Sequence, residues 1–272
     1  MHNDTSSNSD VFRAEHVDYH YPGGPLALRD ISFSVAAGER VAVLGANGSG
    51  KSTLLHLLDG LYFADRGSVL ALGTRLTESS IETLPFARYF RQQVGFLFQN
   101  SDAQLFCARV DEELAFGPLQ LRLPPPEVER RVNDILRLLE IERLRERSPQ
   151  RLSEGEKKKV ALGSILTCAP RVLLLDEPSA GLDPRTRDWL VDLVDSLHRE
   201  KVTLVIATHD LGLARELADR AILLSEDHRL VRDAPMREVL GDRELLWSAN
   251  LVGRAAARPR SLGPQDAHFD SA

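Results

Sequence analysis

Residues 45–53 combine glycines, a lysine and hydroxyl side chains at a spacing suited to holding phosphate groups. The stretch consists of Gly45, Ala46, Asn47, Gly48, Ser49, Gly50, Lys51, Ser52 and Thr53, which matches the pattern G-x-x-x-x-G-K-S/T. Glycines let backbone N–H groups close around phosphate oxygens, and a helix that begins there directs its positive end toward them. All of these residues except Ala46 are candidate nucleotide contacts: Lys51 is expected to reach the β- and γ-phosphates, and Ser52 to bind Mg²⁺.

Two adjacent acids, Asp176 and Glu177, follow an apolar run at residues 172–175. At the end of a buried strand, Asp176 could hold Mg²⁺ directly or through water, and Glu177 could orient and deprotonate an attacking water. Such a pair is otherwise usually a solvated turn. Together with the phosphate-binding stretch, however, it makes nucleotide hydrolysis the expected activity.

The elements around these residues are typical of an α/β fold built on a parallel sheet. Short apolar runs at residues 41–44, 172–175 and 204–207 each stop at a turn or polar residue, as buried parallel strands do. Helical patterns lie between the runs, which predicts crossover helices.

The pattern changes at about residues 100–170, where we expect a helical lobe inserted into the α/β core. Three prolines at residues 124–126 interrupt the chain, and a helix with one apolar face is expected to start at Glu127. A second helix is expected from near Ser153 to Pro170.

Length and composition indicate a globular protein of the cytoplasm. The 272 residues include 43% apolar residues, and 34 basic against 40 acidic side chains give a net charge of −6, which gives no support for nucleic-acid binding. Two cysteines favour a reducing compartment, and no signal sequence is expected. The longest stretch without a charged side chain is residues 160–170, too short for a membrane-spanning helix of about 20 residues. We expect a polar tail at residues 1–10, one domain at residues 11–253 and a flexible tail at residues 254–272.

Residues 152–157, which read LSEGEK, resemble the signature sequence of ATP-binding-cassette (ABC) ATPases. The other motifs of that family occur in order: Tyr21, the phosphate-binding stretch, Gln99, a D-loop at residues 179–183 and His209 after a strand. The resemblance implies that Tyr21 stacks on adenine, with Tyr19 as a competing candidate. It also implies that Gln99 and His209 act with Glu177 in catalysis, and that Gln99 joins Ser52 and Asp176 around Mg²⁺.

The resemblance further implies a P-loop ATPase core, an antiparallel β N-terminal portion and a head-to-tail dimer formed with ATP. In such a dimer, Ser153 and Gly155 face the γ-phosphate that the opposite subunit binds. Ser153 and Glu156 also have the spacing of a helix-capping box, so Ser153 could be a cap as well. Glu154 stands where the family usually has glycine. We expect its negative charge to weaken ATP-driven dimerisation.

Residues 98–106 and 110–118 resemble the energy-coupling-factor group of ABC importers, with Ser101 in place of the usual proline. That group includes the ATPases of cobalt, nickel and vitamin importers. A helix of a membrane partner is expected to dock here, and the acids of residues 111–113 could pair with its arginines. Residues 157–159, three lysines, are expected to form a solvated helix face.

The sequence therefore predicts an ATPase subunit, with ATP and Mg²⁺ as cofactors, of an importer of cobalt or nickel. These ions would be cargo rather than ligands of this chain. The expected partners are integral membrane subunits and a second ATPase subunit, identical or different, at the cytoplasmic face of the membrane. Vitamin import is the main alternative. A soluble ABC ATPase of DNA repair or translation is disfavoured, since the chain has one phosphate-binding motif and no long heptad run.

Overall fold

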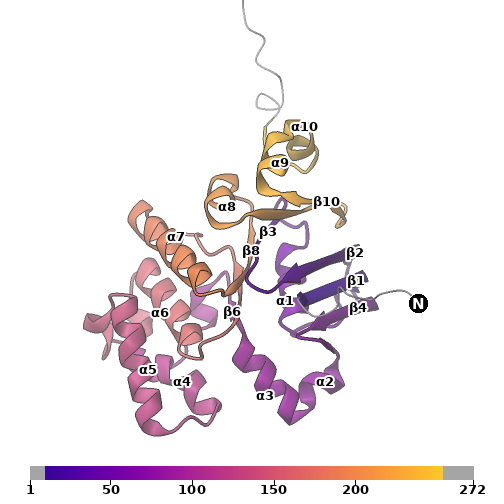
Figure 1. The fold of residues 1–272 in the computed structure, drawn as a ribbon. Helices are drawn as coiled ribbons and strands as arrows, with labels where there is room; N and C mark the ends of the chain where they lie inside the picture. Colours follow the sequence, from indigo (N-terminus) through magenta and orange to yellow (C-terminus); the bar gives the residue numbers. More distant parts are fainter. Residues whose placement is uncertain (1–9, 254–272) are drawn as a thin grey trace, which may run out of the picture.

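Two β-sheets and a group of helices make up residues 10–253, the part of the chain that the computed structural model describes (Figure 1). The larger sheet has six strands in the order β10-β9-β3-β8-β7-β6. Its strands are β3 (Arg40–Leu44), β6 (Val94–Leu97), β7 (Val172–Asp176), β8 (Thr203–Thr208), β9 (Arg220–Leu224) and β10 (Leu230–Pro235). All pair in parallel except β10, which is antiparallel to β9 at one edge. The predicted parallel sheet is thus confirmed.

The smaller sheet is antiparallel and is formed by the N-terminal part of the chain. It contains β1 (Asp10–His20), β2 (Leu26–Ala36), β4 (Arg66–Ala71) and β5 (Thr74–Arg75) in the order β2-β1-β4-β5. β1 already includes Asp10, so the expected N-terminal tail was one residue too long. The remaining residues of both expected tails, 1–9 and 254–272, lie outside the described part.

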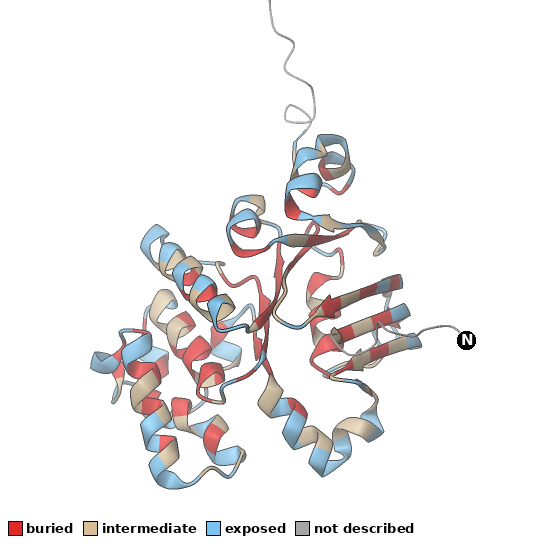
Figure 2. Cartoon of the chain, in the orientation of Figure 1, coloured by how far each residue is buried: buried red, intermediate tan, exposed pale blue. Residues whose placement is uncertain are grey.

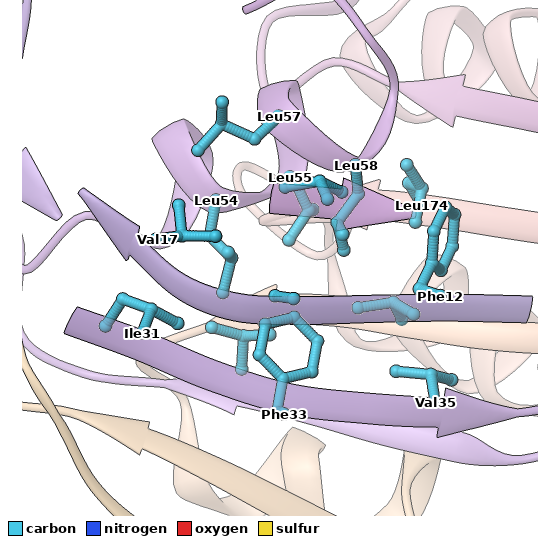
Figure 3. Packing of buried hydrophobic residues seen from close by; sticks show 14 of the residues in the cluster. Phe12, Val17, Ile31, Phe33, Val35, Leu54, Leu55, Leu57, Leu58 and Leu174 are labelled. Carbon is cyan, nitrogen blue, oxygen red and sulfur yellow. The ribbon is translucent and has the colours of Figure 1, made fainter. Parts of the chain in front are cut away.

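Helix α1 (Lys51–Leu58) lies between the two sheets and packs against both. Its leucines 54, 55, 57 and 58 are at most 1% exposed and contact side chains of β1, β2 and β7 (Figure 3). Burying each leucine contributes about 1.5–3 kcal/mol. This packing fixes the helix that carries Lys51 at its first position, immediately after the phosphate-binding stretch.

A helical lobe connects β6 to β7. It is built mainly from α4 (Val110–Gln120), α5 (Pro125–Leu138) and α6 (Glu154–Leu166), and it stands apart from the antiparallel sheet (Figure 1). Its core is continuous with one face of the parallel sheet, the face that carries Leu173 and Leu204. α5 begins at Pro125 rather than at Glu127, because proline is well tolerated in a first helical turn, where no partner for its nitrogen is needed.

The other helices cover the sheets and the C-terminal side. They are α2 (Glu78–Glu82), α3 (Leu84–Gln93), α7 (Pro184–Arg199), α8 (Leu211–Leu217), α9 (Met236–Gly241) and α10 (Arg243–Ser248), with short 3₁₀ turns at Ser101–Ala103, Glu142–Leu144 and Pro149–Arg151. Figure 2 shows the central strands buried while the outer helix faces stay exposed. No helix within residues 10–253 has the length and apolar character needed to cross a membrane.

Candidate nucleotide-binding and hydrolytic site

The phosphate-binding stretch forms a tight loop between β3 and α1. Gly50 is the cap residue of α1 and has φ 106°, a backbone conformation that favours glycine. A Cβ atom at Gly50 would also collide with the backbone oxygen of Ala27. Both constraints explain why this position in the motif is glycine.

A pocket of about 460 Å³ opens in front of this loop. It is lined by Tyr21, Pro25, Leu26, Ala27, Asn47, Gly48, Gly50, Lys51, Ser52, Thr53, Gln99, Glu177 and His228. The fold thus brings together residues from the start of the chain, the phosphate loop, the end of β6 and the end of β7. Its size falls within the range of about 300–1,000 Å³ typical of small-molecule sites.

The structure distinguishes the two candidate adenine-stacking tyrosines. Tyr21 is 38% exposed and lines the pocket, and its hydroxyl lies 2.8 Å from the Thr53 hydroxyl. Tyr19 is 7% exposed and stacks on Tyr62, with ring centroids 5.2 Å apart. Only Tyr21 of these two therefore presents its ring to a ligand.

Lys51 is a buried cation that the loop holds over the pocket. Its Nζ donates to the backbone oxygens of Gly45 and Ala46 at 3.0 and 3.1 Å, and it lies 3.6 Å from Oε1 of Glu177. Burial lowers the pKa of the Lys51 amine, and the nearby carboxylates of Glu177 and Asp176 oppose that shift. A phosphate group is a natural further partner for a cation in this position.

The Glu177 carboxylate is contacted by Lys51, Thr208 and His209. The Glu177 backbone has φ 42°, and its side chain is 8% exposed. Oε2 accepts from the Thr208 hydroxyl at 3.1 Å, and Oε1 lies 2.8 Å from Nδ1 of His209. An ionised carboxylate only accepts hydrogen bonds, so Nδ1 of His209 is the donor in this pair. The site thus fixes one carboxylate between Lys51 and His209 at the edge of the pocket.

Asp176 ends β7 directly before Glu177 and is buried. Burial raises the pKa of its carboxyl, while a hydrogen bond from Ser52 lowers it. Within residues 10–253, Oδ1 of Asp176 is buried and has no hydrogen-bond partner. Carboxylate and hydroxyl oxygens are ligands that Mg²⁺ prefers, so Asp176 and Ser52 fit a magnesium ion.

The signature sequence, residues 152–157, lies at the start of α6 and not at this pocket. Ser153 caps α6, and the expected capping box with Glu156 is present, with the Ser153 N–H donating to Glu156 Oε2 at 3.0 Å. Among the described residues, those that line the pocket do not include Ser153 or Gly155. Gly155 instead faces α7, where an added Cβ would come within 3.1 Å of the Thr186 hydroxyl.

Two expectations for surface charges were wrong. Residues 157–159 are not a solvated face, because Lys158 is 3% exposed, Lys157 is paired with Asp102 at 2.7 Å and Lys159 lies over the ring of Trp189. A helix rotates about 100° per residue, so three consecutive side chains point in different directions.

Of the acids at residues 111–113, Glu113 is not available to a partner. It is 2% exposed, and its Oε2 accepts from the backbone N–H groups of Phe106 and Cys107 at 2.9 and 2.7 Å. Asp111 is paired with Arg109 at 2.7 Å, so Glu112 is the exposed acid of the three.

Sequence reasoning missed His228 and the β2 residues Leu26 and Ala27, which form one wall of the pocket. His228 lies in the turn between β9 and β10, and its backbone oxygen accepts from the Arg29 N–H at 2.8 Å. This contact joins segments far apart in the chain, and no local pattern marks it.

Comparison with known proteins agrees with this geometry. Residues 28–180 match the ABC transporter family. The chain is 44% identical to the nickel import ATP-binding protein NikO of Rhodobacter capsulatus, over 89% of this chain and 96% of that protein. It is 41% identical to the energy-coupling factor transporter ATP-binding protein EcfA of Methanothermobacter thermautotrophicus, over 86% and 74%.

A solved structure, that of cbiO1 from Clostridium perfringens, has a TM-score of 0.76 and 32% identity, with 92% of this chain and 98% of that chain covered. It is described as part of the ABC transporter complex cbiONQ. The phosphate loop, the acids at the end of β7 and the inserted helical lobe all lie within the residues that match the family. The chain therefore belongs to the ABC transporter family, as an ATPase of the energy-coupling-factor type.

Proposed function

We propose that this chain hydrolyses ATP at Glu177 and that the hydrolysis drives import of nickel or cobalt ions through membrane subunits. The observation that carries the hydrolytic part is the cluster of buried Lys51, buried Glu177 and exposed His209 at the edge of the pocket. The importer part is supported by the relatives named above.

In this proposal, the adenine ring stacks on Tyr21 and the phosphates lie on the loop of residues 45–53, where Lys51 compensates their charge. Ser52, Asp176 and Gln99 would hold Mg²⁺. When bound, that ion neutralises charge on the β- and γ-phosphate oxygens. The partnerless Oδ1 of Asp176 supports this assignment.

Glu177 is the general base of the proposed reaction. Its carboxylate takes a proton from the attacking water, whose oxygen forms a bond to the γ-phosphorus as the bond to the leaving ADP oxygen breaks. His209 keeps that carboxylate oriented through the 2.8 Å contact. Gln99, which lines the same pocket, would orient the water or the metal.

A second ATPase subunit would complete the site. Ser153 is exposed at the start of α6, a 13-residue helix whose N-terminal end favours negative charge. Because Ser153 and Gly155 do not line the pocket of their own subunit, we infer that they act on nucleotide held by the partner ATPase, in a homodimer or a heterodimer.

The membrane subunits would dock on the helical lobe, at the cytoplasmic face. Phe106, Phe116 and Leu119 are 62%, 41% and 52% exposed, and the two phenylalanine rings contact each other with centroids 4.8 Å apart. Glu112 is exposed in the first turn of α4, where it lines a shallow pocket together with Leu119. An apolar patch with one free acid suits an amphipathic helix that carries a basic residue.

The metal is assigned as cargo from the similarity to the nickel import protein. The vitamin importers of the same group are the alternative, and no role with nucleic acid is proposed. To test the cargo, the full-length chain is tagged and purified from detergent-solubilised membranes, and the proteins that come with it are identified.

Metal import predicts that a small metal-binding membrane subunit co-purifies, and that vesicles of the complex take up nickel or cobalt only with ATP. A vitamin-binding membrane subunit in its place would overturn metal import while leaving the ATPase assignment intact. Ribosomes or DNA-repair proteins as the main companions would overturn the importer assignment.

A further inference from the structure

Lys158, the buried lysine of α6, contacts the segment that carries Gln99. Nζ of Lys158 donates to the backbone oxygen of Gln99 at 3.0 Å. Lys158 belongs to the same helix that begins after Ser153, only five positions along. One side chain therefore joins Gln99, the residue proposed to orient the water or the metal, to the helix proposed to face the opposite subunit.

A second contact fastens the same segment, residues 98–104, to α6. The Gln104 amide accepts from the Phe98 N–H at 3.3 Å and donates to the backbone oxygen of Ala161 at 2.9 Å. The carboxamide oxygen and nitrogen of Gln104 thus link the start of this segment to the middle of α6. The Gln104 amide also donates to the Ser164 hydroxyl at 3.3 Å, so with the pair of Lys157 and Asp102 four residues of α6 anchor residues 98–104.

Placing the charged amine of Lys158 in this buried position costs free energy. Burial disfavours the charged form of Lys158 and lowers the pKa of its amine, and the charges of Glu154 and Asp176 only partly oppose this shift. An apolar side chain would avoid that cost, since buried charges are tolerated only when they are paired and hydrogen-bonded. The Gln99 carbonyl is the acceptor that the structure gives the amine.

We propose that Lys158 is a positioning residue that fixes Gln99 to the signature helix, so that the nucleotide site of one subunit and the signature it presents to the other move together. This inference rests on the proposed roles of Gln99 and Ser153. Lys158 does not touch the nucleotide in this scheme; it acts through Gln99.

Lys159 provides a matched control on the same helix. Its Nζ donates to a backbone oxygen too, that of Leu139 at 3.2 Å, but this contact lies inside the helical lobe. Lys158→Met and Lys159→Met each remove one lysine–carbonyl hydrogen bond from α6, and only the first of these bonds leads to Gln99.

The test measures steady-state ATP hydrolysis, ATP affinity and thermal stability of the full-length chain. We expect Lys158→Met to lower kcat about tenfold, the factor that loss of a hydrogen bond to a charged group allows. ATP affinity should stay within about twofold, because the loop of residues 45–53 is untouched. Lys159→Met should keep kcat within about twofold of wild type. Lys158→Arg, which keeps a charged donor, should retain most of the wild-type kcat.

A double-mutant cycle separates positioning from general damage. If Lys158 acts through the side chain of Gln99, then Lys158→Met has no further effect on kcat in a Gln99→Ala background. Losses that multiply would overturn the proposal, as would equal losses in Lys158→Met and Lys159→Met. Should Lys158→Met fail to fold, Gln104→Leu must give the same fall in kcat and the same non-additivity, or the proposal is wrong.

The control Glu177→Gln distinguishes this inference from the proposed function. If Glu177→Gln turns over like wild type, the proposed hydrolytic site is wrong. If Glu177→Gln is inactive and Lys158→Met is normal, only the positioning role of Lys158 is wrong.

Discussion

Asp59 gives the protein a pH-dependent stability that can be worked out from the structure. It caps the C-terminal end of α1, the helix that carries Lys51, and its side chain is 6% exposed. Burial raises the pKa of its carboxyl from 3.8 to about 7, even though Arg91 NH1 lies 3.1 Å from Oδ2 and lowers it. The perturbation we consider is Asp59→Asn, which keeps the size and removes the titration.

The sign follows from proton binding. Between pH 4 and pH 7 the folded state holds a proton on Asp59 that the unfolded state has lost, so the free energy of unfolding falls as the pH rises. Each pH unit inside this window costs about 1.4 kcal/mol, which gives at most about 3 kcal/mol between pH 5 and pH 7. Below pH 4 both states are protonated and this loss is absent.

The assay is urea denaturation of the full-length chain at pH 5, 6, 7 and 8. Wild type should lose up to about 3 kcal/mol relative to Asp59→Asn between pH 5 and pH 7, and nothing more above pH 8. Asp192→Asn, which changes an exposed acid of α7, should track wild type. Parallel pH profiles for wild type and Asp59→Asn would refute the reasoning.

Two further predictions concern nucleotide binding and dimerisation. Glu154 is 68% exposed in the first turn of α6, with Lys157 at 3.3 Å, so Glu154→Gly should lower the ATP concentration needed for dimerisation by about threefold, as judged by gel filtration. An unchanged ATPase rate and ATP affinity would remove the idea that this acid moderates dimerisation. Tyr21→Ala should weaken ATP binding about tenfold in equilibrium titration because a stacking surface is lost, whereas Tyr21→Phe, which loses only the contact with Thr53, should stay within about threefold. Equal effects of the two variants would show that stacking is not the role of Tyr21.

The parts of the site predictable from sequence are those in which consecutive residues determine the chemistry. The phosphate loop depends on local backbone freedom and on the helix that follows, and the acids of β7 depend on where one buried strand ends. Both signals lie within about ten residues, so no knowledge of the tertiary structure is needed.

The parts that sequence could not predict depend on which face of an element meets which neighbour. Tyr19 competes with Tyr21 by position, and burial separates them, since Tyr19 is buried while Tyr21 is exposed at the pocket. Lys158 looks like its two neighbours in sequence, yet the rotation of α6 brings its amine to the Gln99 backbone oxygen, while Lys157 pairs with Asp102. Glu113 satisfies backbone groups of a loop whose path no periodicity encodes.

The hydrolytic role of Glu177 is tested most directly by comparing Glu177→Gln with wild type and with Glu200→Gln, an exposed acid at the end of α7. ATP binding and ATP-driven dimerisation should persist in Glu177→Gln, while hydrolysis should fall by about 10²- to 10⁴-fold because the general base is lost. Glu200→Gln should hydrolyse ATP like wild type. Near-wild-type turnover by Glu177→Gln would contradict the account.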